Sequence, residues 1–102
     1  MGEGGYVMPP KSFIKGVREI CDKNGILMIL DEVQTGFGRT GKWFGLEHFD
    51  IKPDILCFAK ALSSGFPLSG IAASPEIQSK WVPGTNYFDS PSAEELANLL
   101  VM

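Results

Sequence analysis

The sequence contains little of the chemistry that histidine and cysteine provide, with one histidine, His48, and two cysteines, Cys21 and Cys57, among 102 residues. A serine nucleophile needs a nearby imidazole base, so with His48 as the only candidate a serine-hydrolase arrangement has little support. The cysteines lie far apart in apolar stretches. This placement predicts buried free thiols of a reducing compartment and no metal site, with a disulfide or a metal pair as the alternative.

The sequence also lacks an excess of positive charge and a long apolar run. Its 9 Lys and Arg against 12 Asp and Glu give a net charge of -3, which argues against nucleic acid or an anionic membrane as a partner. The longest apolar run, residues 26–30, is far shorter than the roughly 20 residues that span a membrane. The amino terminus shows no secretory signal. We expect a cytoplasmic protein, or a mitochondrial one if a targeting segment lies outside this chain.

Helical and strand-like segments alternate along the chain. Apolar residues at helical spacing predict a helix over residues 10–24, with prolines at its start and Gly25 just past its end. Short apolar segments predict strands at residues 26–30, 54–58 and 69–73, each of a kind that is typically buried on both faces. The first two strands are far enough apart to be parallel, whereas the last two are too close for a helical crossover and should be antiparallel. The expected fold is α/β, with a mixed, mostly parallel sheet and packed helices.

The stretch from Gly36 to Gly41, GFGRTG, fits the G-x-G-x-x-G pattern of dinucleotide-binding turns. That fingerprint needs its first glycine directly after a strand and a helix that opens at its third glycine. Here residues 31–35 separate the apolar run from Gly36, and only a short helical pattern follows. The spacing therefore disfavours a dinucleotide module, which would bind a nicotinamide cofactor.

Two chemically useful side chains follow predicted strands. Asp31, with Glu32 beside it, directly follows the first strand, at the edge where open α/β sheets bind ligands. Lys60 follows the second strand in the apolar context of Ala59, Ala61 and Leu62. Such surroundings favour the neutral amine that attacks carbonyls. Taken singly, Asp31 could simply accept turn amides, and Lys60 could extend its ammonium into water. Together they supply what pyridoxal phosphate needs, an amine for its aldehyde and a carboxylate that keeps its ring nitrogen protonated.

The motifs around these two residues resemble those of a known family. LDEVQTGFGRTGKWFGLEHF and PDILCFAKALSSGFPLSG look like the core of the class-III pyridoxal-phosphate-dependent aminotransferases, the group of ornithine, acetylornithine, 4-aminobutyrate and alanine-glyoxylate aminotransferases. The resemblance implies that residues 1–84 are part of the cofactor-binding large domain of the aspartate-aminotransferase-like fold. Residues 85–102 then form a divergent carboxyl-terminal segment, which capping-box spacing predicts to be helical from about residue 92.

The resemblance also implies a role for individual residues. Asp31 would pair with the pyridinium nitrogen, Val33 would pack against one face of the ring, and Gln34 would bond toward the phenolic oxygen. Lys60 would form the Schiff base with the cofactor and later shuttle a proton between the substrate and the cofactor. Glu3, in a segment that resembles the family's G-E-G-G motif, would lie near the substrate side of the cleft.

Arg39 has two possible roles. Taken alone, an arginine in this turn could clamp a substrate carboxylate. The family resemblance implies instead a structural role for Arg39 within the turn.

At the level of function, the resemblance implies an enzyme that moves an amino group from a 4-aminobutyrate-, ornithine- or alanine-like donor to a 2-oxo acid, as a homodimer or a dimer of dimers. Family enzymes are several times longer, so their phosphate-binding turn and small domain would lie outside this chain. Thr85 and Asn86 do not restore the family's Thr-Phe/Tyr-Gly-Gly-Asn-Pro segment. We expect a fragment of the large domain, with a catalytically inert truncated chain or interaction fragment as the alternative.

Overall fold

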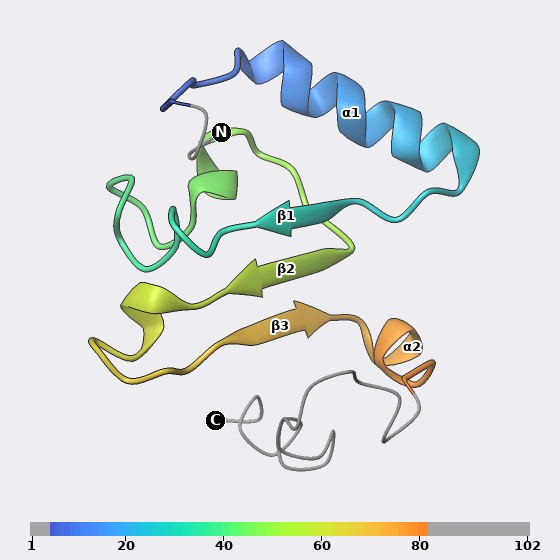
Figure 1. Cartoon of the computed structure of the whole chain (residues 1–102). Helices are drawn as coiled ribbons and strands as arrows, with labels where there is room; N and C mark the ends of the chain where they lie inside the picture. Colours follow the sequence, from blue (N-terminus) through green and yellow to red (C-terminus); the bar gives the residue numbers. More distant parts are fainter. Residues whose placement is uncertain (1–4, 82–102) are drawn as a thin grey trace.

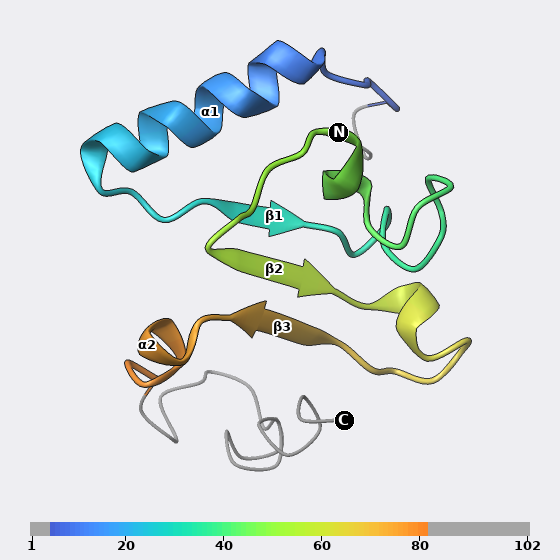
Figure 2. The same ribbon diagram turned by 180° about the vertical axis from the view of Figure 1, so that it is seen from behind.

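A computed structural model describes residues 5–81, which form a three-stranded sheet with helical segments around it (Figures 1 and 2). In chain order the elements are α1 (Lys11–Asn24), β1 (Ile29–Asp31), the 3-10 helix η1 (Gly45–His48), β2 (Ile55–Phe58), the 3-10 helix η2 (Lys60–Leu62), β3 (Gly70–Ala73) and α2 (Pro75–Gln78). Glu3, the boundary after residue 84 and the helix expected from about residue 92 all lie outside the described residues.

Helix α1 begins and ends at the residues that the sequence marks as boundaries. Pro10 precedes its first turn with φ -64°, a value that the proline ring fixes. Gly25 caps its end at φ 63°, in the left-handed region that favours glycine, and the Ile26 amide donates to the Cys21 carbonyl at 2.9 Å. Among residues 5–81, no helix is long and apolar enough to cross a membrane.

The sheet has the order β1-β2-β3, with β1 and β2 parallel and β2 and β3 antiparallel. Figure 1 shows the arrows of β1 and β2 pointing the same way, with α1 beside β1 and α2 beyond β3. The predicted mixed sheet and both strand directions are confirmed; within the described residues the sheet has one parallel and one antiparallel pair. The parallel pair places the carboxyl ends of β1 and β2 at the same edge.

The expectation that the strand segments are buried on both faces is wrong for this structure, because no residue of β1, β2 or β3 is fully buried. Met28 is buried, but the side chains of Ile26, Leu27 and Ile29 are 54%, 54% and 58% exposed. Side chains of a strand point to the two faces of the sheet, and within the described residues no helix packs closely on the faces of β1. Together with Cys21, Met28 forms the small buried apolar centre of the described residues.

An ion pair fastens α1 to the segment before β2. The Arg18 guanidinium lies 2.7 Å from an Asp54 carboxylate oxygen and 2.7 Å from Asp22, one helical turn ahead. Asp54 also accepts the Met28 amide at 2.7 Å. The Met28 amide, followed by Arg18, lowers the pKa of Asp54 below its usual range. Asp54 therefore connects the helix, the approach to β1 and the start of β2.

Candidate active site

Asp31 and Lys60 lie at one edge of the sheet because of the register of its parallel pair. Asp31, the last residue of β1, stands opposite Cys57 on β2, and Lys60 opens η2 shortly after β2 ends. In Figures 1 and 2 the turn that follows β1 and the helical turn that follows β2 lie at the same end of the sheet. The strand pairing thus brings together the two residues that the sequence singled out as a cofactor pair.

The Asp31 side chain is exposed at this edge and is oriented by the turn that it begins. Its Oδ1 accepts the Val33 amide at 2.9 Å, which is the turn-amide contact that the sequence left open as an alternative. No other partner of the Asp31 carboxylate lies within residues 5–81, so Oδ2 can accept a proton donor from a ligand. Val33 is half-buried and Gln34 is exposed in the same turn.

Cys57 is a neighbour of Asp31 that the sequence argument did not connect with the site. Burial, and after it the negative charge of Asp31, raises the pKa of the Cys57 thiol. The thiol beside the carboxylate is therefore held in its neutral form. Both cysteines are free, as predicted, with Cys21 buried and Cys57 half-buried. No group of three metal-ligating side chains gathers within the described part of the chain.

Lys60 is exposed, which corrects the expectation of an apolar surrounding. Its neighbours Ala59, Ala61 and Leu62 are half-buried, but the lysine itself extends from the open end of the sheet. Its backbone has φ 43°, in the left-handed region that residues with a side chain rarely adopt. The amine is therefore presented by a tight turn at the edge of the sheet.

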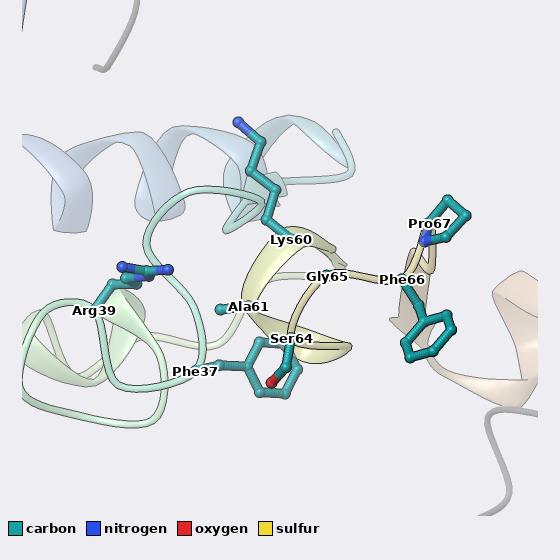
Figure 3. A pocket seen from close by; sticks show the side chains of 8 residues that line it. All are labelled: Phe37, Arg39, Lys60, Ala61, Ser64, Gly65, Phe66 and Pro67. Atoms are coloured by element: carbon teal, nitrogen blue, oxygen red, sulfur yellow. The ribbon is translucent and has the colours of Figure 1, made fainter.

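Lys60 borders an open pocket, drawn in Figure 3. Its volume of about 770 Å³ lies within the range of ligand sites. Residues from the glycine-rich turn and from the segment after β2 line it: Phe37, Arg39, Lys60, Ala61, Ser64, Gly65, Phe66 and Pro67. Asp31, Val33 and Gln34 are not among these lining residues, so the pocket and the predicted ring-binding residues share only Lys60.

Glu32 is the buried residue that holds the site's framework, and the sequence argument gave it no role of its own. Its side chain is 4% exposed, and its carboxylate accepts the Gly45 amide at 2.9 Å, the Leu46 amide at 2.6 Å and the Thr35 hydroxyl. Its own amide donates to the Cys57 carbonyl at 2.9 Å. Glu32 thereby ties the end of β1 to β2 and to the start of η1.

The glycine-rich stretch forms a turn with no long helix after it, in agreement with the prediction against a dinucleotide module. A Cβ atom on Gly36 would lie 2.9 Å from the Glu32 carbonyl oxygen, so only glycine fits there. The Phe37 ring stacks edge-on against those of Phe44 and Phe58, with centroids 5.2 and 5.9 Å away. This aromatic cluster packs the turn against β2.

Arg39 makes no hydrogen bond or ion pair within the described residues, and its side chain is exposed. The turn is closed by main-chain bonds instead, from the Gly38 amide to the Trp43 carbonyl at 3.3 Å and from the Gly41 amide to the Gly38 carbonyl at 3.1 Å. The structural role that the resemblance implied for the Arg39 side chain is therefore not seen here.

Comparisons with known proteins agree on one family. The sequence profile named Aminotransferase class-III matches residues 1–99. An acetylornithine/succinyldiaminopimelate aminotransferase of Photorhabdus laumondii is 48% identical over 96% of this chain and 25% of its own length. A leucine/methionine racemase of Thermococcus litoralis is 49% identical over 80% of this chain and 18% of its own.

The solved structure of an ornithine aminotransferase from Plasmodium yoelii superimposes with a TM-score of 0.83 at 38% identity, covering 91% of this chain and 25% of that one. The chain thus spans a quarter or less of the curated relatives it matches. Its fold is a part of the fold of these aminotransferases. The chain belongs to the class-III aminotransferase family.

Proposed function

We propose that this chain carries the reactive lysine and the ring-binding carboxylate of a pyridoxal-phosphate-dependent aminotransferase. The observation that supports it is the parallel register that pairs Asp31 with Cys57 and so sets Asp31 and Lys60 at one sheet edge. Neither side chain has an ion-pair partner within residues 5–81, so both are available to a ligand. A carboxylate and an amine in this arrangement fit the ring nitrogen and the aldehyde of the cofactor.

Each residue has a task that suits its side chain. Lys60 Nζ would hold the cofactor through its aldehyde, and the same amine would move the proton at the substrate's α-carbon. Asp31 Oδ2 would accept a hydrogen bond from the protonated ring nitrogen and stabilise its positive charge, while the Val33 amide orients Asp31 by donating to Oδ1. Val33 packs on the ring face, and Gln34 bonds toward the phenolic oxygen. When bound, the cofactor supplies the electron sink for the bonds at the α-carbon.

The proposed substrates carry an amine and a carboxylate. The names of relatives point to acetylornithine, succinyldiaminopimelate and ornithine as donors, and a 2-oxo acid accepts the amino group. We place the activity in the cytoplasm, in a homodimer or a dimer of dimers. The phosphate-binding and small-domain parts of such an enzyme would lie outside these residues.

Borohydride reduction tests the role of Lys60 in the polypeptide that carries this sequence. With pyridoxal phosphate present, reduction should attach the cofactor permanently to the peptide that contains Lys60. The Lys60→Ala variant should lose this label completely, and Lys80→Ala, which removes an exposed lysine just after α2, should keep it. A Lys60→Ala protein that is still labelled to the same extent contradicts the proposal.

The racemase among the relatives calls for a second measurement, because the same lysine could serve racemisation. Amino transfer consumes one 2-oxo acid for each donor, whereas racemisation changes only the optical rotation of the donor. We expect stoichiometric loss of the 2-oxo acid.

If the 102-residue chain binds no cofactor at all, the alternative of a catalytically inert chain holds for this chain.

A further inference from the structure

Glu32 lies among the residues that the proposed function assigns to the cofactor ring. It directly follows Asp31 and precedes Val33 in the turn after β1. Its amide donates to the Cys57 carbonyl at 2.9 Å, which carries the hydrogen bonding between β1 and β2 one residue past Asp31. Its carbonyl accepts the Gly36 amide at 2.9 Å and so closes the turn. The main chain of Glu32 thus fixes both ends of the segment of residues 32–36.

The Glu32 side chain connects this turn to η1. The residue is 4% exposed, and its carboxylate oxygens accept the Thr35 hydroxyl, the Gly45 amide at 2.9 Å and the Leu46 amide at 2.6 Å. In Figures 1 and 2 the turn after β1 and the green 3-10 helix η1 lie at the same end of the sheet. A charged acceptor makes stronger hydrogen bonds than a neutral one, and a buried amide that loses its acceptor is costly. The buried carboxylate therefore fastens the turn within itself, through Thr35, and to η1.

The same turn orients Asp31. The Val33 amide donates to Asp31 Oδ1 at 2.9 Å, so the direction of the Asp31 carboxylate depends on the position of that amide. Val33 lies between Glu32 and Thr35, whose side chains are joined by the hydroxyl–carboxylate hydrogen bond. Loss of this bond would free the turn and with it the donor that orients Asp31.

We propose that Glu32 is a positioning residue of this site. Its buried carboxylate fixes the turn so that Asp31 keeps the orientation in which Val33 binds Oδ1 and Oδ2 is left for the cofactor's ring nitrogen. This inference rests on the proposed function for the role of Asp31. A site is precise only where the residues that touch a ligand are themselves held by their neighbours. Glu32 therefore acts on the cofactor through the turn and not by contact.

Two variants disturb the turn, and two controls leave it intact. Glu32→Gln keeps the size of the side chain but places an amino group where one oxygen accepts a main-chain amide. Thr35→Val removes the hydroxyl at an exposed position and leaves the bonds between Glu32 and η1 in place. Thr35→Ser, which keeps the hydroxyl, is its matched control. Asp54→Asn is the control for stability, because the Asp54 side chain binds Arg18 and Met28 at the other end of the parallel pair.

Hydrogen exchange of the cofactor-free polypeptide that carries this sequence is the first measurement. In Glu32→Gln and Thr35→Val, the peptide that contains residues 31–36 should exchange severalfold faster, while peptides from α1 and β3 keep their rates. Thr35→Ser should exchange like the unmodified polypeptide, and Asp54→Asn should keep the rate of the turn. Local opening changes exchange in one segment, whereas a loss of overall stability changes it everywhere. Equal acceleration of all peptides in Glu32→Gln and Thr35→Val contradicts a positioning role.

The second measurement follows the bound cofactor itself. The NMR shift of the ring nitrogen in isotope-labelled pyridoxal phosphate reports whether that nitrogen is protonated. In Glu32→Gln the shift should move toward the value of the neutral ring. The dissociation constant of the cofactor should rise roughly tenfold or more, since hydrogen bonds between charged groups have about that strength. Thr35→Val should show the same changes to a smaller degree, and Thr35→Ser and Asp54→Asn should show neither.

The outcomes separate this inference from the proposed function. If borohydride labels Lys60, and Glu32→Gln and Thr35→Val keep the exchange rate of the turn and the ring-nitrogen shift, only the positioning role is refuted. If Lys60 is never labelled and the turn still exchanges faster in both variants, the hold of Glu32 on the turn stands and the proposed function fails. Where Glu32→Gln does not fold, the comparison of Thr35→Val with Thr35→Ser decides alone.

Discussion

At the scale of single residues, two neighbouring carboxylates do different work. Asp31 is the last residue of β1, and Glu32 is the first residue after it. Asp31 is exposed at the sheet edge, where a ligand can reach it, while Glu32 is 4% exposed and satisfied by three donors. Asp31 and Glu32 both follow the first predicted strand, and the family resemblance singled out Asp31 as the cofactor-binding acid. It gave no comparable signal for Glu32, whose partners Gly45 and Leu46 are distant in the chain.

Replacing Glu32 with alanine should destabilise the chain more than replacing any exposed carboxylate with alanine. The Gly45 and Leu46 amides would lose their acceptor in a buried place, which we expect to lower the free energy of unfolding by about 2 to 4 kcal/mol. Urea unfolding followed by circular dichroism measures this loss. Glu19→Ala, on the exposed surface of α1, is the matched control; equal losses in both variants contradict the assigned role.

At the scale of elements, the residues at the ends of helices and strands allowed most of the correct predictions from the sequence. Helix α1 begins one residue after the expected start and ends where expected, because Pro10 and Gly25 fix both ends locally. Strands β2 and β3 each begin one residue later than predicted and end at the predicted residue. β1 is displaced toward Asp31 and is largely exposed. Strand length depends on pairing with the neighbouring strand and burial depends on what covers the faces of the sheet, and the run of apolar residues specifies neither.

The ion pair between Arg18 of α1 and Asp54, just before β2, should make the stability of the chain depend on pH. The pKa of Asp54 is lowered in the folded state, so its stabilising effect is present above the unfolded value, near 3.8. The effect is lost as the pH falls through the lower, folded value. Stability should therefore decrease on acidification through about pH 4.

Thermal unfolding between pH 7 and pH 2 measures this effect. Asp54→Asn should be less stable than the unmodified chain at pH 7 and should approach it at the acid end. Asp50 is exposed and has no described side-chain partner, so Asp50→Asn should retain the full dependence of stability on pH. If Asp54→Asn keeps the same acid slope, another carboxylate is responsible.

At the scale of the whole molecule, the described chain exposes much apolar surface on α1 and β1. The side chains of Phe13, Ile20 and Ile29 are each 58% to 59% exposed, and Trp43 is 72% exposed. Exposed apolar patches and unpaired strand edges promote association. The relatives, of which the chain covers a quarter or less, have further polypeptide that could cover such faces.

The 102-residue chain should therefore self-associate at rising concentration. Sedimentation velocity should show an average mass that increases with protein concentration. Ile29→Lys should move this increase to at least severalfold higher protein concentrations, because a charge on the outer strand opposes pairing between strand edges. Ser12→Lys adds the same charge at an exposed position of α1. A concentration-independent monomer mass for the unmodified chain contradicts the prediction.

The sequence by itself determined the element types, the strand directions and the placement of Asp31 and Lys60 after two strands. These follow from local rules, since helix ends, apolar runs and connection lengths are all contained in short stretches. Only the tertiary structure decided that Asp31 lies opposite Cys57, that Glu32 is buried, and that Arg39 shares a pocket with Lys60. Side-chain burial and strand pairing depend on contacts between residues far apart in the chain, and a local sequence pattern does not specify which distant residues come into contact.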